Sequence, residues 1–457
     1  MIDKAEIDSK SVELEVHTSN VQRDYVFGWL LYGIYDNQNP LSHMLALKGG
    51  NAFRKAYFPN GRFSNDLDFS TELQIDIDRL LAGLKQACAK AAEGSGVHFL
   101  VDDSRVSART SVDGESEIYE ARVYFKSFYG EEDVRIRIDL DIKEYDRIFL
   151  PLQSRRLIHA YSDSSLCHCD IRCLKLEELL ASKLKALLGR VHSSDLYDFV
   201  HAVFFQKALD ISRREVISTF LKQTIYEPQP MSAKSLLLEL PFQTIKALWN
   251  EFIVCPKTSV FSFDDAETWF KTVITEMFSV FAPQVQSPAY AVAGRGIALD
   301  YFSSGPRSQI LEAARLQRVI RFVYDGLQRV VEPYALVFKR RLDGVAREYF
   351  YGWDLQGGRS GQVGIKSYIA SKVGAIQITD QLFQPRFPVG LVKDGGYFSR
   401  PFSSSTRRMS SRPSTTEYTV ACPYCGKRFK RSRYDTRLNE HKDRFGNRCY
   451  GRVGHIV

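Results

Sequence analysis

The chain has 457 residues, 44% of them hydrophobic and 25% charged, which is the composition of a globular protein with two to four domains. No apolar run reaches the roughly 18 residues of a membrane-spanning helix, and the N-terminus MIDKAEIDSK lacks a signal-peptide apolar segment, so the sequence predicts a cytoplasmic protein. The net charge of +8 is concentrated in residues 400–457, which hold 14 Lys or Arg and 4 Asp or Glu. This basic segment favours nucleic acid as a partner, although a solubilising tail would have a similar composition.

In chain order, the first elements alternate between helices and strands. Residues 1–44 are expected to be helical, MLALKGG predicts a short buried strand ending in a glycine turn, and NAFRKAYF predicts a helix. RFSNDLDFS predicts a second strand because its polar and apolar residues alternate, and IDIDRLLAGLKQACAKAAEGSG predicts a helix that ends at glycines. ARVYFKSFYG and EDVRIRIDLDIKEYD predict a hairpin that turns at Gly130 and Glu131.

The later elements are mostly helical and then mostly strands. LKLEELLASKLKALLGR predicts an amphipathic helix, and SSDLYDFVHAVFFQ predicts another, capped by Ser193 or Ser194. The patterns together predict an α+β protein. Its expected parts are a core at residues 1–206, a helical domain at 207–290, a β domain at 300–392, a flexible basic linker at 393–417 and a C-terminal module at 418–457.

The stretch LKGGNAFRKAYFPNGRFSNDLDFS carries the first chemical signal. In a strand, Asp66 and Asp68 point to the same side, and a third acid from a later strand, Asp139 or Asp141, can join them. Three carboxylates of this kind suit Mg²⁺ or Mn²⁺, which assist phosphoryl transfer, and the Gly49-Gly50 turn lets the backbone approach a phosphate closely. Each part alone is weak, since a lone Asp-x-Asp is usually a solvated strand edge. Their order along the chain is more specific.

This order resembles the nucleotidyltransferase superfamily of DNA polymerase beta type, and more closely the AbiEii/AbiGii toxin family of bacterial nucleotidyltransferases. LKGGNAFR resembles the Gly-Gly motif of that family, and RFSNDLDFS resembles its R-x-S-x-D-L-D-F motif. LEELLASKLKALLGRVHSSDLYDF resembles the motif with a helical Lys, a following Arg and D-x-x-D. The resemblance covers roughly residues 40–285. In one departure, Ser194 stands where the family often has Arg before the final D-x-x-D.

The resemblance implies a polymerase beta-like fold for the core and a role for each matching residue. Asp66, Asp68 and Asp141 would hold Mg²⁺, with Asp139 as the alternative third acid. Lys183 would contact the triphosphate, although without the other motifs it would be taken for a solvated helix face. Further roles fall to residues around the phosphates: a polar role for Asp195, and the shaping of the nucleotide pocket for Gly49, Gly50, Arg54 and Ser64.

Residues 300–392 resemble a WYL-type domain, a small Sm-like β-barrel that binds nucleic acid or nucleotide-like ligands. The likeness rests on Tyr324, on RVVEP from Arg329, and on the aromatic strand Tyr349–Leu355; the tryptophan-tyrosine-leucine triplet itself is absent. A scaffold domain with an aromatic core would give the same pattern. The candidate ligand contacts are Arg329, Arg340, Arg341 and Lys366.

The C-terminal module carries metal-ligand spacing. Cys422 and Cys425 are followed by His441, as in a zinc finger with two cysteines and two histidines, and Cys449 closes a Cys₃His site, with His455 as the alternative. Zinc would hold so small a module together, and its basic residues favour phosphate contacts, although a protein-binding finger is the alternative. Cys167, Cys169 and Cys173 are interpreted as ordinary strand residues before a helix.

The sequence therefore predicts a Mg²⁺-dependent nucleotidyltransferase that moves NMP from an NTP or dNTP to a nucleic-acid acceptor, with the tRNA 3′ end favoured. By resemblance it would act in toxin–antitoxin or anti-phage (antiviral) defence, with a cognate antitoxin or effector protein as a possible partner. Three alternatives stay open: template-independent synthesis of an oligonucleotide signal, nucleotidylation of a protein, and a DNA-binding regulator with an inactive transferase core.

Overall fold

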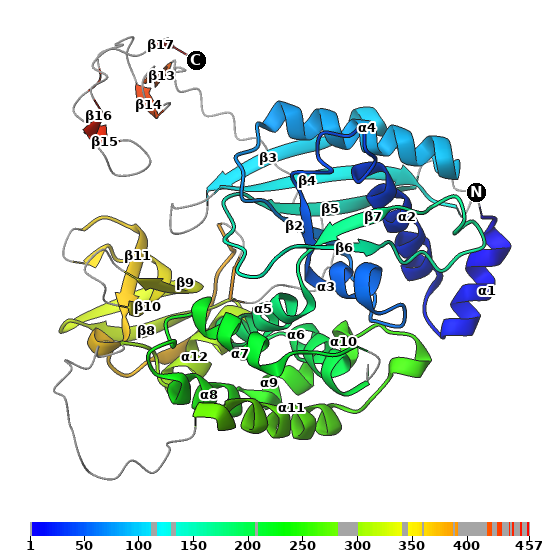
Figure 1. Cartoon of the computed structure of the whole chain (residues 1–457). Helices are drawn as coiled ribbons and strands as arrows, with labels where there is room; N and C mark the ends of the chain where they lie inside the picture. Colours follow the sequence, from blue (N-terminus) through cyan, green and yellow to red (C-terminus); the bar gives the residue numbers. More distant parts are fainter. Residues whose placement is uncertain are drawn as a thin grey trace. The chain divides into compact units, whose positions relative to one another are not determined.

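The computed structural model describes residues 2–110, 117–128, 134–205, 209–281, 300–340, 346–358, 361–386 and 389–391, with short pieces between 418 and 456. The chain forms two compact units, Met1–Tyr397 and Phe398–Val457, and the fold is mixed α+β, as predicted (Figure 1). Within the described residues, no helix is long and apolar enough to span a membrane. Several predicted features lie outside the described residues: the turn at Gly130 and Glu131, the linker at 393–417, Arg341 and Cys425.

A mixed seven-stranded sheet forms the centre of the first unit. Its strand order is β3-β4-β5-β2-β1-β7-β6, and β2 runs parallel to β5 and antiparallel to β1. The strands are β1 (Ala46–Lys48), β2 (Asp66–Ser70), β3 (Arg105–Thr110), β4 (Glu117–Lys126), β5 (Arg135–Lys143), β6 (Gln153–Arg156) and β7 (Asp170–Cys173). The central β2 is therefore tied on both sides, which fixes the direction of its side chains.

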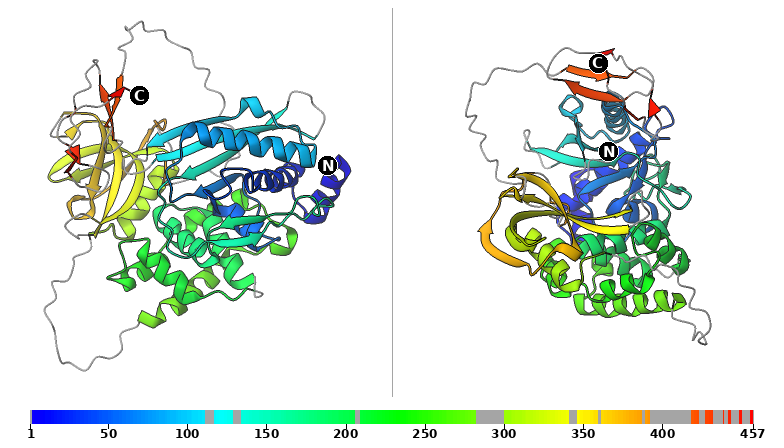
Figure 2. Two further views of the ribbon diagram at one scale, coloured as in Figure 1. Left: turned by 45° about the horizontal axis from the view of Figure 1, so that its top comes forward. Right: turned by 90° about the vertical axis from the view of Figure 1, so that its left-hand side faces the viewer.

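Three N-terminal helices are layered from this sheet outward: the third contacts β3 and β4, the second packs on the third, and the first packs on the second (Figure 2). They are α1 (Lys4–Leu14), α2 (Thr18–Ile34) and α4 (Ile77–Ser95). A side chain at Gly33 of α2 would lie 2.2 Å from the carbonyl oxygen of Ala87 in α4, so this glycine lets the two helices touch along their backbones. Most of α2 is buried, which explains its aromatic-rich sequence.

A second group of helices follows the sheet along the chain. It comprises α5 (Leu176–Gly189), α6 (Ser193–Val200), α7 (Arg213–Lys222), α8 (Pro230–Leu238), α9 (Phe242–Ala247), α10 (Trp249–Phe252) and α11 (Phe263–Met277). The predicted serine cap of α6 is wrong. The N-cap is His192, whose ring nitrogen accepts a hydrogen bond from the Ser194 N–H. Short helical segments lie between the strands at α3 (Gly49–Ala52), a π-helical turn at Phe53–Tyr57 and a 3₁₀ turn at Val101–Asp103. Others lie in the helical group: a π-helical turn at His201–Phe205 and 3₁₀ turns at Lys257–Ser259 and Phe278–Phe281.

The predicted β-barrel at residues 300–392 is wrong, because the strands form an open antiparallel sheet. The order is β11-β10-β9-β8-β12, so β11 and β12 are both edges, whereas a barrel requires the first and last strands to pair. Helix α12 (Ser304–Arg315) packs on β8, β9 and β12 and buries apolar surface that closure would otherwise have to cover. The strands are β8 (Arg318–Tyr324), β9 (Leu327–Arg340), β10 (Ala346–Asp354), β11 (Gly364–Ile369) and β12 (Gln377–Leu382), with a 3₁₀ turn at Ala370–Lys372.

The second unit has two small described sheets. One has the order β14-β13-β17, and the other pairs β15 with β16. The strands are β13 (Tyr418–Ala421), β14 (Arg428–Arg431), β15 (His441–Lys442), β16 (Arg448–Cys449) and β17 (His455–Ile456).

A buried ion cluster ties α2 to the π-helical turn at Phe53–Tyr57. The carboxylate of Asp24 lies 2.7 Å from the Arg54 Nε and 2.9 Å from the Lys55 Nζ, and the Tyr161 hydroxyl donates to it at 2.9 Å. Burial raises the pKa of Asp24, but Arg54 and Lys55 outweigh burial and hold that pKa well below its usual value. Asp24 is therefore charged at neutral pH.

Replacing Asp24 with Ala leaves two buried cations without their carboxylate, and we expect the free energy of unfolding to fall by about 3–5 kcal/mol. Urea unfolding of the full chain measures this change. The control is Asp78→Ala, an exposed acid in the first turn of α4, which should change stability by less than about 0.5 kcal/mol. Equal losses in both variants would contradict the assignment of Asp24 as a structural anchor.

Candidate functional site

Three carboxylates meet where β2 and β5 run side by side. The register pairs Asp66 with Asp139 and Asp68 with Asp141, and ligand oxygens of Asp66, Asp68 and Asp141 lie within 4.8 Å of one another. We call these three residues the aspartate triad. Three half-buried carboxylates at this spacing fit a hard divalent cation, because such ions take oxygen ligands and offset the repulsion of the acids. Their role as metal ligands stays a prediction.

Asp139 points to the same side of β5 but lies outside the triad. Its carboxylate is 2.9 Å from the Arg137 Nε and 3.6 Å from the Arg122 Nε, and Arg122 stands opposite it in the β4–β5 register. The two arginines draw Asp139 away from Asp66. Of the two acids that the sequence offers, the structure therefore brings Asp141 to the triad.

The glycine turn is pressed directly against the triad. Gly49 has φ +71°, and a Cβ there would lie 2.0 Å from the Asp68 Oδ2. A Cβ at Gly50 would lie 2.7 Å from the Ser64 Oγ, and that hydroxyl donates to the Asp66 Oδ1 at 3.0 Å. No side chain fits at either glycine without moving the residues that hold the carboxylates. The structure thus brings Gly49, Gly50 and Ser64 to the place that the sequence predicts.

Five charged residues, Arg62, Lys183, Arg190, Asp195 and Asp198, form what we call the ion network beside the triad. The Lys183 Nζ lies 3.0 Å from the Asp195 Oδ1 and 2.8 Å from the Asp198 Oδ2. The guanidinium of Arg190 pairs with both oxygens of Asp195 at 2.7 and 2.8 Å, and that of Arg62 pairs with both oxygens of Asp198 at 2.8 and 2.9 Å. Three cations surround two carboxylates, so the network carries a net positive charge.

Burial and charge oppose each other in the ion network. Burial raises the pKa of Asp195, but Arg190 and Lys183 outweigh it and hold that pKa far below the usual value for Asp. Burial likewise raises the pKa of Asp198, and Arg62 and Lys183 bring the net pKa below its usual value. Both acids are therefore ionised at neutral pH. Asp195, predicted to be a polar site residue, acts in this structure on Lys183 and Arg190.

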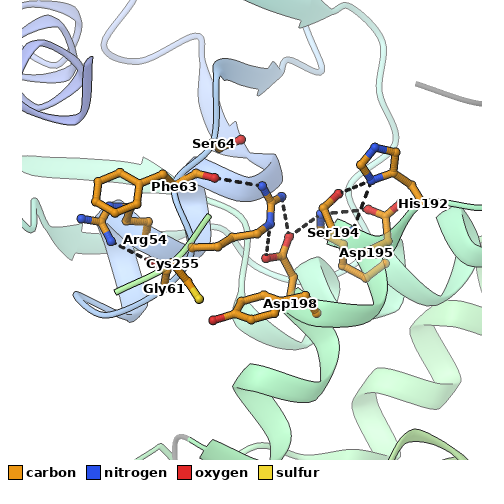
Figure 3. Close-up of polar contacts among 12 residues, drawn as sticks. Arg54, Gly61, Phe63, Ser64, His192, Ser194, Asp195, Asp198 and Cys255 are labelled. Atoms are coloured by element: carbon orange, nitrogen blue, oxygen red, sulfur yellow. Dashed lines mark hydrogen bonds and ion pairs between the residues drawn. The ribbon is translucent and has the colours of Figure 1, made fainter. Parts of the chain in front are cut away.

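Arg54 lies away from the triad, in contrast to its predicted role in nucleotide binding. Its side chain is 7% exposed and pairs with Asp24, and its Nη1 donates to the Gly61 carbonyl oxygen at 2.6 Å (Figure 3). Its guanidinium also lies 3.8 Å from the ring centroid of Phe63. These contacts occupy Arg54 in holding the loop before β2, and Arg54 lines neither of the two cavities described next.

Two cavities flank the aspartate triad and share Gly49, Asp68, Lys183 and Arg190. The smaller cavity has a volume of about 130 Å³ and is also lined by Gly50, Arg62, Ser64 and Asp66. The larger cavity has a volume of about 560 Å³ and extends between the end of β5, α5 and α7. Two adjoining cavities therefore open onto one cluster of carboxylates.

Sequence reasoning assigned no role to Arg62, Arg190 or His192. Both arginines stand inside the quoted motifs, one two residues before Ser64 and the other at the end of α5, so the motifs contained the signal. His192 lines the smaller cavity, and its Nδ1 lies 2.6 Å from the Ser194 hydroxyl (Figure 3). Burial lowers the pKa of His192 to about 4, so its ring is neutral at pH 7.

Two of the residues predicted to contact a ligand at the open sheet, Arg329 and Lys366, lie near an acid of the same sheet. The Arg329 Nε and the Lys366 Nζ lie 3.9 and 3.6 Å from the Asp354 Oδ2, and Asp354 is fully buried. Of Arg340 only the backbone is described. Arg329 and Lys366 therefore balance a buried acid, and ligand binding at this sheet stays a prediction.

In the second unit, ligand atoms of Cys422, His441 and Cys449 lie within 4.8 Å of one another. Two thiols and one imidazole suit Zn²⁺, so the described donors fit the predicted site. His455 is described only by its backbone, which pairs with Ala421. Cys167, Cys169 and Cys173 join no such group among the described residues.

Comparisons with known proteins bear on the first unit. Residues 29–254 match the family described as nucleotidyl transferase AbiEii toxin, type IV toxin–antitoxin system. Two solved structures are similar: MenT4, a nucleotidyltransferase toxin from Mycobacterium tuberculosis (17% identity, 61% of this chain and 90% of that chain, TM-score 0.38), and JHP933 from Helicobacter pylori (16% identity, 57% and 91%, TM-score 0.35). A search of curated proteins gave no match.

Replacing Asp195 with Asn leaves Lys183 and Arg190 without a buried counter-charge, and we expect the free energy of unfolding at pH 7 to fall by about 3–5 kcal/mol. Because folding depresses the pKa of Asp195, its stabilisation is complete above the unfolded pKa of about 3.9 and is lost as pH falls below that value. The difference in free energy of unfolding between wild type and Asp195→Asn should therefore become smaller below about pH 4.

Chemical unfolding at pH 7 and at several values below pH 4 measures this narrowing. Asp102→Asn serves as the control, because the Asp102 side chain is fully exposed. A difference between wild type and Asp195→Asn that stays constant with pH would contradict the ionised, cation-held state of Asp195.

Proposed function

We propose that this nucleotidyltransferase, which carries an AbiEii toxin domain at residues 29–254, moves a nucleoside monophosphate from an NTP or dNTP to a hydroxyl group of nucleic acid. The 3′ end of tRNA is the favoured acceptor, and the reaction serves toxin–antitoxin or anti-phage defence. The observation that carries the proposal is the aspartate triad beside the glycine turn, with cations at hand for a triphosphate.

The triad would hold Mg²⁺ or Mn²⁺, which supplies positive charge to the reacting phosphate oxygens. Gly49 and Gly50 leave room for the triphosphate beside the carboxylates, and Ser64 orients Asp66 through its hydrogen bond. Lys183 and Arg190 line both cavities and attract the β- and γ-phosphates.

The chemical step exchanges one phosphoester bond for another. The acceptor oxygen bonds to the α-phosphorus while the bond from that phosphorus to the bridging oxygen breaks and pyrophosphate leaves. The acceptor proton passes to a carboxylate of the triad. Catalysis on this account rests on position and charge, since the ion network fixes Lys183 before substrate arrives.

Three other functions remain as alternatives, and two of them would use this site. Synthesis of an oligonucleotide signal and nucleotidylation of a protein would use the same triad with a different acceptor. A DNA-binding regulator would need neither the triad nor the ion network, so the intact geometry of both favours an enzyme.

The direct test is incubation of the full chain with each α-labelled NTP and dNTP, Mg²⁺ or Mn²⁺, and tRNA, followed by a denaturing gel. We expect label on tRNA, reduced about 100-fold or more in Asp66→Ala/Asp68→Ala because the ions lose their ligands. Asp102→Ala should retain full activity. Label on protein, or a ladder formed without tRNA, would replace the proposed acceptor; retained transfer in the double variant would refute the site.

Gly49→Ala tests the glycine turn separately from the metal ligands. A methyl group there meets the Asp68 Oδ2 and strains a backbone of positive φ, so we expect a loss of transfer of about 100-fold. Gly305→Ala is the control, because a Cβ at Gly305 meets nothing within 4 Å. Transfer by Gly49→Ala at the wild-type rate would show that the turn does not set the position of Asp68.

For the C-terminal unit we propose a structural Zn²⁺ held by Cys422, Cys425, His441 and Cys449, in a module that positions or senses nucleic acid together with the WYL-like sheet. The nearness of the three described donors supports it. We expect about one zinc per chain by elemental analysis, with loss of the metal in Cys449→Ser and retention in His455→Ala. Retention in Cys449→Ser with loss in His455→Ala would assign the fourth ligand to His455.

A further inference from the structure

Tyr145 lies at the larger cavity in a backbone conformation that few side chains adopt. Its φ is +50°, in the left-handed region, and 49% of the residue is exposed. A bulky residue holds this conformation only where its neighbours impose it. In the described part of the chain, Tyr145 makes no hydrogen bond or aromatic ring contact, and about half of the residue is exposed.

The residues on both sides of Tyr145 are anchored. The Tyr119 hydroxyl donates to the Glu144 Oε2 at 3.0 Å, and Glu144 is buried. The Asp146 carboxylate accepts from the Lys48 Nζ and the Lys143 Nζ, both at 2.7 Å, and from the Ser70 hydroxyl at 2.6 Å. The chain therefore turns at Tyr145 between two residues that are held in place, and Tyr145 lines the cavity.

The wall around Tyr145 is basic. Of the described residues that line the larger cavity, seven are basic and four acidic: Lys48, Lys143, Arg147, Lys183, Lys185, Arg190 and Lys222 against Asp68, Asp146, Glu178 and Asp195. Lys185 and Lys222 are exposed, and no acid among the described residues lies within ion-pair distance of either. An exposed aromatic ring beside unpaired lysines suits a strand of nucleic acid, because bases stack on the ring and phosphates meet the cations.

Resting on the function proposed above, the two cavities can be assigned to the two reactants. Gly50 and Ser64, which make room for the triphosphate, line the smaller cavity alone. The larger cavity is also lined by Asp68 and is left for the acceptor. We propose that the larger cavity receives the single-stranded 3′ end of the acceptor nucleic acid, with an end base stacked on Tyr145 and the preceding phosphates held by Lys185 and Lys222.

This assignment makes Tyr145 a positioning residue for the acceptor and not for the nucleotide. Removing the ring should raise the KM for acceptor by about 5- to 150-fold, as expected for loss of one stacked base, and leave the KM for NTP within about twofold. Tyr145→Phe keeps the stacking face and should behave as wild type. A purely structural role for Tyr145 would change both KM values, or would depend on the hydroxyl.

The experiment uses the full chain and a trinucleotide RNA with 4-thiouridine at its 3′ end. Ultraviolet cross-linking with peptide mapping reports where the end base lies even if no transfer occurs, and it separates the cavity from the basic C-terminal unit. Transfer of α-labelled NMP to the same trinucleotide gives both KM values. The variants are Tyr145→Ala, Tyr145→Phe and Lys185→Ala/Lys222→Ala, with Leu166→Ala and Lys90→Ala as exposed controls.

We expect a cross-link in the peptide that contains Tyr145, lost in Tyr145→Ala and kept in Tyr145→Phe and both controls. Cross-links confined to other peptides, an unchanged acceptor KM in Tyr145→Ala, or a rise in the NTP KM alone would overturn the assignment. Transfer that persists unchanged in Tyr145→Ala would leave the proposed function intact and refute only this inference. A cross-link at Tyr145 without transfer under any condition would support binding of the nucleic-acid end in the larger cavity and count against the proposed transfer reaction.

Discussion

The parallel pairing of β2 with β5 is the constraint on which the rest of the site depends. It sets Asp68 beside Asp141 and brings three carboxylates within 4.8 Å, an arrangement that repels itself in the absence of cations. The surrounding sequence offsets that repulsion. The glycine turn removes every competing side chain, and the ion network places three cations at the edge of the triad.

The same ion pairs join the sheet to the helices. Arg62 comes from the loop before β2 and holds Asp198 of α6, while Lys183 of α5 holds both Asp195 and Asp198. A second network, Asp146 with Lys48 and Lys143, fixes the chain where β5 ends. Buried ion pairs of this kind are costly to break, so they help to fix the distance between Lys183 and the triad. On this account, the fold contributes to the reaction by holding Lys183 and the aspartate triad at fixed positions.

Strand alternation in the sequence was enough to predict that Asp66 and Asp68 share a face, and motif order was enough to place Gly49, Gly50 and Ser64 near them. The strand pattern alone left Asp139 and Asp141 both open, and only the family resemblance favoured Asp141; in the structure, Arg122 of a neighbouring strand pairs with Asp139. The placement of Arg54 could not be predicted for a related reason: it follows the glycine turn closely, but the π-helical turn carries its side chain toward Asp24. Neighbours in sequence do not reveal which way a short helix faces.

The β domain shows that residue alternation predicts strands but does not predict how a whole sheet is arranged. Alternating residues correctly predicted strands between residues 321 and 391, but alternation does not say whether the first and last strands pair, and here a helix covers the sheet instead. The cap of α6 is a smaller example, since His192 can accept a backbone hydrogen bond as a serine does.

The central claim is that Asp66, Asp68 and Asp141 form the divalent-ion site and that Asp139 does not. Titration of the full chain with Mn²⁺, followed by electron paramagnetic resonance in the presence of a non-hydrolysable NTP, tests it directly. The account predicts that Asp141→Asn weakens Mn²⁺ binding at least about tenfold, whereas Asp139→Asn, two residues away on the same strand face, leaves it unchanged. Loss of binding in Asp139→Asn with retention in Asp141→Asn would contradict the account.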